Sequence, residues 1–194
     1  MIRNTLLLLS ILLILNNYGC QSHHDHPHPE HDDQQLETKL SNIDYDARLD
    51  SLGIELNSPG SPVANYVNIR QAGKILYLAG KGPSLPQGGY ITGQVGNDLT
   101  VEQGYEAAKL AAIAQLSVLK DHLGDLNKVK QLLKVTGMVN AVSGFGDQPE
   151  VINGFSDTMV AVFGEKGKHA RAAVGMGSLP RNIAVEVDLI VEIY

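Results

Sequence analysis

Residues 170–193, "ARAAVGMGSLPRNIAVEVDLIVEI", decide the fold. The segment opens as a run of small apolar residues, which is typical of a buried β-strand, except that Arg171 stands at its entrance. After Leu179 and Pro180 the residues alternate between two faces of a second strand. One face carries Val185, Val187, Leu189, Val191 and Ile193, and the other carries Glu186, Asp188, Ile190 and Glu192. This alternation predicts a sheet with one dry face and one polar or ligand-facing face.

Two helices are predicted upstream of this segment. Thr100 is a good N-cap, and Gln103 completes a capping box ahead of apolar residues at helical spacing. Gly124 ends that helix as the residue just past its last turn. A second helix starts around Pro149, a favoured first helical position, and runs to about Phe163.

Other segments predict strands. Residues 66–70 and 75–79 predict a hairpin joined at Ala72-Gly73, residues 88–96 contain a further short strand, and residues 129–141 form a longer one. The order is therefore strands, helix, strand, helix, strands. This order predicts an α+β domain over residues 43–194, with two helices packed on one face of a mixed β-sheet.

The composition excludes several classes of protein. The chain has 194 residues, is 43% hydrophobic and carries a formal net charge of −6. A nucleic-acid partner would require a basic stripe, so we expect none. The sequence has no P-loop, G-x-S-x-G, H-E-x-x-H or C-x-x-C motif, and we expect no cofactor.

The first 20 residues predict export. Arg3 precedes an apolar run from Leu6 to Leu15, which is too short to span a bilayer, and Gly19 and Cys20 follow. This pattern resembles a bacterial lipoprotein signal over residues 1–19, with a lipid anchor on Cys20. The alternative is an ordinary secretory signal with a chance cysteine. The preferred hypothesis is an exported bacterial lipoprotein, anchored to a membrane and periplasmic or at the cell surface.

Residues 20–42 predict a disordered, polar tether. The tether contains five of the seven histidines: His23, His24, His26, His28 and His31. Imidazoles interleaved with carboxylates can chelate divalent metals, although the spacing fits no closed structural site. Loose metal binding and a merely soluble tether are both open.

Arg171 is the strongest candidate for a site in the domain. A guanidinium is costly to bury unless it is paired, and its planar fork matches a carboxylate. Glu186, expected on the next strand, could neutralise it, or it could bind an anionic substrate. His169 precedes Arg171 by two residues and could share its face, whereas His122 is expected on a solvated helix end.

Several segments resemble one known family. The Arg171 strand, Leu179-Pro180 and Glu186 match the C-terminal signature of the Rid proteins, the reactive intermediate deaminases or YjgF / L-PSP endoribonuclease family. Residues 64–83, "ANYVNIRQAGKILYLAGKGP", resemble its first hairpin, with Tyr66 at its pocket tyrosine. Residues 148–171, "QPEVINGFSDTMVAVFGEKGKHAR", resemble its second helix, with Asn153 at a family asparagine.

The resemblance implies a chorismate-mutase-like fold and a homotrimer, in which sheets line a central barrel and ligand clefts lie between subunits. It implies hydrolysis of 2-imino acids to 2-keto acids and ammonia. In those clefts Arg171 would hold the substrate carboxylate and Glu186 would orient water or relay a proton. Tyr66 and Asn153 would bind substrate.

The chain departs from the family at two positions. Ala173 stands where many members have cysteine, and Ala79 stands where archetypal deaminases have serine. The chain therefore resembles a divergent branch. The alternatives to a deaminase are a non-catalytic trimeric lipoprotein that binds small carboxylates and a metal-buffering surface lipoprotein that acts through its histidines.

Overall fold

The computed structural model describes residues 43–194, and the secondary structure follows the predicted order closely. The predicted signal over residues 1–19, the tether over residues 20–42, the anchor on Cys20 and the five tether histidines lie outside the described residues. They stay predictions.

The sheet has five strands in the order β1-β2-β5-β3-β4. The strands are β1 (Ile69–Ala72), β2 (Ile75–Lys81), β3 (Val129–Asn140), β4 (Ala170–Met176) and β5 (Val185–Ile193). Only β3 and β4 pair in parallel, whereas the other neighbours are antiparallel. The prediction of a mixed sheet is therefore confirmed.

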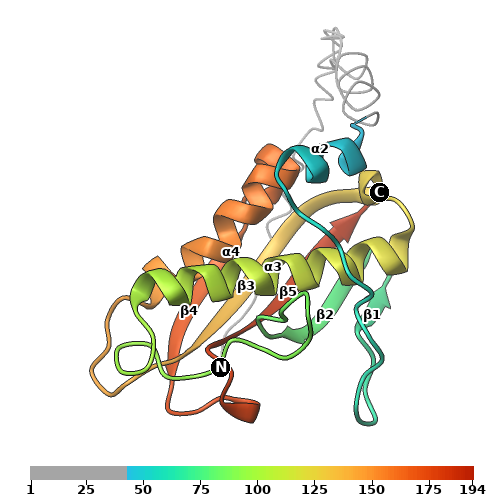
Figure 1. The fold of residues 1–194 in the computed structure, drawn as a ribbon. Coiled ribbons are helices and arrows are strands. Elements are labelled where there is room, and N and C mark those ends of the chain that lie inside the picture. The colour runs from blue at the N-terminus through green and yellow to red at the C-terminus, as the bar shows by residue number, and fades with distance from the viewer. Residues whose placement is uncertain (1–42) are drawn as a thin grey trace, which may run out of the picture. The chain divides into compact units, whose positions relative to one another are not determined.

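Helices cover one face of this sheet. They are α2 (Tyr45–Ser51), α3 (Val101–Leu123) and α4 (Gln148–Phe163), and Figure 1 shows α3 and α4 lying across the same face. The predicted capping box is present, because Thr100 Oγ1 accepts from the Gln103 amide and Gln103 Oε1 accepts from the Thr100 amide. Gly124 follows the last residue of α3 with φ of 73°, as its predicted role at the helix end requires. The opposite side of the sheet is called here the open face.

The hydrophobic core lies between the sheet and these helices. Val185, Val187, Leu189 and Val191 of β5 are buried, while the alternate residues of that strand are half-buried. Two glycines permit close packing of α4. A Cβ at Gly154 would overlap the backbone of Tyr105 in α3, and one at Gly137 would lie 2.7 Å from Ile152.

Two strand predictions are wrong in detail. β1 begins at Ile69 and not at Tyr66, because β2 is irregular after Leu78 and the ladder to β1 stops there. Residues 88–96 form a loop with isolated bridges, because Gly88, Gly89, Gly93 and Gly96 all adopt positive φ, which interrupts an extended strand.

None of the helices within residues 43–194 is both long and apolar enough to cross a membrane.

Candidate functional site

Arg171 lies at the start of β4 and reaches α4. Its Nη1 donates to Asn153 Oδ1 at 2.9 Å and to Ser156 Oγ at 3.0 Å. The structure therefore brings together two of the predicted site residues, Arg171 and Asn153. Within residues 43–194 no carboxylate lies within 4.0 Å of this half-buried guanidinium, and Nε and Nη2 have no hydrogen-bond acceptor. These two donors form one edge of the planar fork that a carboxylate matches.

His169 fixes the hydroxyl that Arg171 contacts. Its Nδ1 lies 2.7 Å from the Gly167 carbonyl oxygen and donates to it, so Nε2, 3.1 Å from Ser156 Oγ, accepts the hydroxyl proton. Burial lowers the pKa of His169, the Gly167 hydrogen bond opposes that shift, and the Arg171 charge adds to it. A neutral His169 thus leaves the lone pairs of Ser156 Oγ directed at Arg171. The prediction that His169 shares the face of Arg171 is confirmed.

Ser156 was missed by the sequence reasoning, although a signal was present. It follows Asn153 by three residues on α4, a spacing that places two side chains on one face of a helix. His122 is exposed in the last turn of α3, as expected.

The predicted partnership of Arg171 with Glu186 on an adjacent strand is wrong for a single chain, because β3 lies between their strands. Arg171 pairs with Val135, and Val135 pairs with the buried Leu189, so these three residues share the helix-covered face. Glu186 pairs with Met138 at the opposite phase of the alternation and therefore lies on the open face. It cannot neutralise Arg171 of the same chain.

Glu186 packs against the end of β2. A Cβ at Gly80 would overlap the Glu186 carboxylate, so the missing side chain at Gly80 makes room for it. Burial raises the pKa of Glu186, and the neighbouring charge of Asp188 raises it further. A carboxyl group whose pKa is raised toward neutrality is suited to donate as well as accept a proton.

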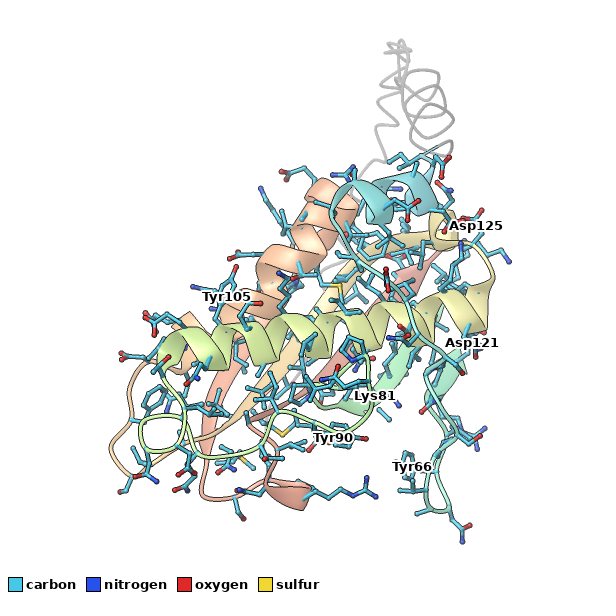
Figure 2. The ribbon with its side chains drawn as sticks, in the orientation of Figure 1. Tyr66, Lys81, Tyr90, Tyr105, Asp121 and Asp125 are labelled. Atoms are coloured by element: carbon cyan, nitrogen blue, oxygen red, sulfur yellow. The ribbon has the colours of Figure 1, made fainter. Side chains whose placement is uncertain are left out.

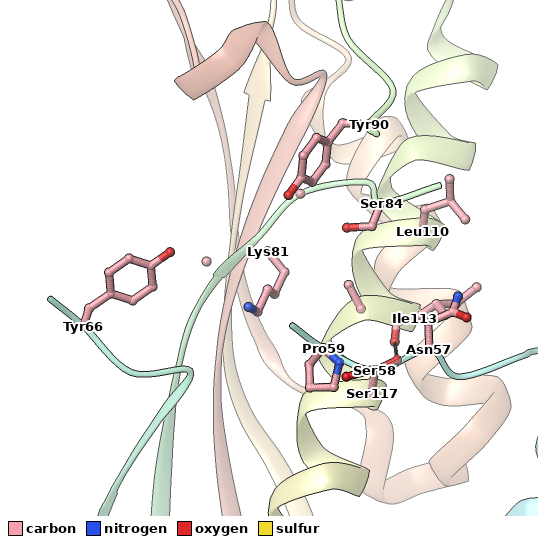
Figure 3. Close-up of a pocket in the computed structure, with 13 residues that line it drawn as sticks. Asn57, Ser58, Pro59, Tyr66, Lys81, Ser84, Tyr90, Leu110, Ile113 and Ser117 are labelled. Carbon is pink, nitrogen blue, oxygen red and sulfur yellow. Dashed lines mark hydrogen bonds between the residues drawn. The ribbon is translucent and has the colours of Figure 1, made fainter. Parts of the chain in front are cut away.

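Tyr66 lines a pocket together with residues at the end of β2. It is 51% exposed, so it is not a core residue. Together with Gly80 and Lys81 it lines a pocket of about 160 Å³ at one end of β2. Figure 2 shows Tyr66, Lys81 and Tyr90 on the same side of α3, and Figure 3 shows the Lys81 side chain between Tyr66 and that helix. Sequence reasoning missed Lys81, because a lysine at a strand end is usually a solvated residue.

One chain therefore carries two separate polar regions. The first, called here the arginine region, contains Arg171, Asn153, Ser156 and His169. The second, called here the glutamate region, contains Glu186, Gly80, Tyr66 and Lys81. Gly175 of β4 lies against α4, since a Cβ there would lie 2.7 Å from Gln148 Nε2.

Within the described residues no group of three or more His, Cys, Asp or Glu side chains gathers closely enough to hold a metal ion.

Comparisons with known proteins bear on the family and the fold. Residues 46–193 match the family model described as "YjgF/chorismate mutase-like, putative endoribonuclease". Protein TCP17 of Trypanosoma cruzi is 43% identical over 148 residues, which cover 76% of this chain and 92% of TCP17.

Two solved structures are also similar. Protein Atu1372 of Agrobacterium tumefaciens, described as of unknown function, is 41% identical with a TM-score of 0.73, over 82% of this chain and 99% of that one. A "putative endoribonuclease" of Shewanella oneidensis is 32% identical with a TM-score of 0.74, over 77% of this chain and 99% of that one.

Proposed function

Since the chain belongs to the YjgF/chorismate mutase-like, L-PSP endoribonuclease family, we propose that it is a Rid-type deaminase that hydrolyses 2-imino acids to 2-keto acids and ammonia. The observation that supports this proposal most directly is the guanidinium of Arg171. It is half-buried, held by two neutral side chains, and has no carboxylate partner among residues 43–194. Such a group needs an anion, and the carboxylate of an imino acid supplies one.

Besides Arg171, which binds the carboxylate, the reaction needs a group that can both accept and donate a proton. Water adds to the imine carbon to give a carbinolamine, which expels ammonia: R–C(=NH)–CO₂⁻ + H₂O gives R–CO–CO₂⁻ + NH₃. Glu186 accepts a proton from the attacking water and delivers it to the imine nitrogen, which gives the carbinolamine. It then takes the proton of the carbinolamine hydroxyl and passes it to the amino group, which leaves as ammonia. Burial and Asp188 raise the pKa of Glu186, and a less acidic carboxyl group is the stronger base toward the attacking water.

We propose that the complete site forms between two copies of the chain. Arg171 comes from the arginine region of one protomer and Glu186 from the glutamate region of its neighbour, as in a homotrimer with its open faces around a central barrel. The open face supports this arrangement. Tyr77, Val174 and Met176 are exposed there, and large apolar side chains that share one sheet face are usually covered.

An alternative activity is suggested by the descriptions of the relatives as endoribonucleases. The acidic chain disfavours it, because a polyanion would be repelled. Within residues 43–194 no pair of histidines is placed for general acid and base catalysis, since His122 is exposed at the end of α3 and His169 packs against α4.

The test generates 2-iminopropanoate in situ with an amino-acid oxidase and follows its loss in competition with semicarbazide. We expect the protein to accelerate the loss, Arg171→Ala to abolish most of the effect, and Arg181→Ala, which removes an exposed arginine, to preserve it. If the protein does not accelerate imine loss over buffer, the proposed deaminase activity is wrong for this substrate. Pyruvate binding that depends on Arg171 without any turnover would instead favour a non-catalytic carboxylate-binding protein.

The oligomeric state is tested by light scattering. A mass of three chains is expected, and a monomer would contradict a site shared between protomers.

A further inference from the structure

A pocket beside the proposed site is lined by a lysine and by apolar side chains that the proposed reaction does not use. It lies between the end of β2 and one face of α3, and the loop before β1 closes it. Its walls are formed by Asn57, Ser58, Pro59, Tyr66, Gly80, Lys81, Gly82, Ser84, Tyr90, Leu110, Ile113, Ala114 and Ser117. Its volume of about 160 Å³ suits a group of a few non-hydrogen atoms.

Lys81 is the charged residue of this wall. Its Nζ donates to the neutral Asn68 Oδ1 at 2.7 Å, and within residues 43–194 no carboxylate lies within 4.0 Å of it. Lys81 is half-buried, and burial lowers its pKa. An ammonium has three donors, so two remain for another acceptor. A partly desolvated cation without a counter-ion is stabilised by an anion placed beside it.

The remaining wall defines the kind of anion. Leu110, Ile113 and Ala114 of α3 provide an apolar floor, while the hydroxyls of Ser84 and Tyr90 lie on the polar side. A carboxylate on a short hydrocarbon chain satisfies both surfaces. An inorganic phosphate would leave the apolar floor facing a strongly hydrated ion.

The pocket adjoins the proposed reaction centre. Gly80 lies between the two: its missing side chain leaves room for the Glu186 carboxylate on the open face, and it also lines the pocket, whose other wall is α3. Because β1 pairs with β2 only as far as Leu78, no strand within residues 43–194 covers this edge of β2 at Gly80, and a substrate whose imine carbon lies near Glu186 can extend its side chain around the edge toward Lys81.

We propose that Lys81 makes the site selective for 2-imino acids that carry a second carboxylate on a short side chain. This inference rests on the proposed function, in which Arg171 of a neighbouring copy holds the first carboxylate. Lys81 binds the second one, and Ser84 and Tyr90 complete its hydrogen bonding. The competing role of Lys81 is to fasten the loop before β1, because Asn68 also donates to the Gly60 carbonyl oxygen.

The experiment measures kcat/KM for 2-iminosuccinate and 2-iminoglutarate against 2-iminopropanoate and 2-iminobutanoate, all formed in situ. Charge-assisted hydrogen bonds support a preference of about tenfold or more for the diacids in the wild type. In Lys81→Gln the ratio of diacid to monoacid kcat/KM should fall about tenfold, and Lys81→Arg should restore much of it. Lys74→Gln, which removes an exposed lysine of the β1–β2 turn, should keep the wild-type ratio.

A binding measurement distinguishes failure of the diacid preference from failure of the proposed deaminase activity. Calorimetry with 2-oxoglutarate and 2-oxobutanoate needs no turnover, and 2-oxoglutarate should bind at least about tenfold more tightly, a preference lost in Lys81→Gln. Absence of turnover on every imine would remove the deaminase, while the binding preference would still support the diacid site. Equal affinity for the two keto acids in the wild type, or an unchanged ratio in folded Lys81→Gln, overturns the inference. Should Lys81→Gln not fold, the wild-type ratio and Lys81→Arg decide the question.

Discussion

Arg171 and Glu186 face opposite sides of one sheet. Arg171 lies on the face that α4 covers, Glu186 lies on the open face, and β3 separates their strands. The two backbone positions are about 10 Å apart across the strands and about 10 Å apart along them. One chain therefore cannot direct both side chains at one small imino acid, whereas two copies can.

This separation predicts complementation between inactive variants. Arg171→Ala and Glu186→Gln should each lose most activity. When the two are refolded together at equal amounts, about a quarter of the shared sites will contain both native residues, because each site draws one region from each of two protomers. Activity should recover toward that fraction, measured as the rate of imine loss per chain.

The matched control mixes Arg171→Ala with Asn153→Ala. Both changes lie in the arginine region, since Arg171 donates to Asn153, so a mixed site always contains one of them. This mixture should show no recovery beyond the activities that the two variants have alone. Failure of the Arg171→Ala and Glu186→Gln mixture to recover, with mixed oligomers demonstrated, would contradict a site shared between protomers.

Gly80 predicts a second effect. In Gly80→Ala the added Cβ overlaps the Glu186 carboxylate and must displace it. We expect kcat/KM to fall about tenfold or more, with little change in the free energy of unfolding, because the displaced group is the end of a flexible side chain. Gly146→Ala is the control, because a Cβ there meets nothing within 4 Å and its φ is not positive. Full activity in Gly80→Ala would contradict a catalytic role for Glu186.

Much of the fold was predictable because its signals are local. Thr100 and Gln103 satisfy the first backbone amides of α3 within one turn, and Gly124 adopts the backbone conformation that ends it. The alternation of β5 gives its buried face directly, since consecutive side chains of a strand point to opposite sides.

The strand order was not predictable in the same way. β3 inserts between β4 and β5 because of packing between distant segments, and no local pattern near Arg171 or Glu186 encodes that insertion. Only the strand order and the pairing register of the folded sheet show that Arg171 and Glu186 lie apart on opposite faces. Lys81 was also missed, since its burial comes from the loop before β1 and from α3, both distant in sequence.

The lowered pKa of His169 predicts that the free energy of unfolding decreases at acid pH. Burial and Arg171 lower its pKa in the fold from the ordinary value of 6.5, so the unfolded chain binds the proton more readily. The contribution of His169 is therefore present above about pH 6.5 and is lost as the pH falls through the lowered pKa. In His169→Gln, whose amide also can bond to Ser156, the decline in the free energy of unfolding between pH 7 and pH 5 should be smaller. Urea unfolding at matched pH values measures it, and equal declines would contradict the neutral imidazole.

The raised pKa of Glu186 predicts that the free energy of unfolding falls as the pH rises. The carboxyl group that the proposed reaction needs therefore lowers stability at neutral pH. Burial and Asp188 raise its pKa in the fold above the ordinary 4.5, so the unfolded chain loses the proton first and the fold is penalised as the pH rises above that value. Glu186→Gln removes the ionisable group. It should therefore be more stable than the wild type at pH 7, with the gain shrinking toward zero near pH 4, while imine hydrolysis is lost. Denaturant titrations across this range, paired with the imine assay, measure both quantities. A variant that is less stable than the wild type at every pH would mean that the Glu186 carboxylate stabilises the fold, and its conservative replacement could no longer be used to separate catalysis from folding.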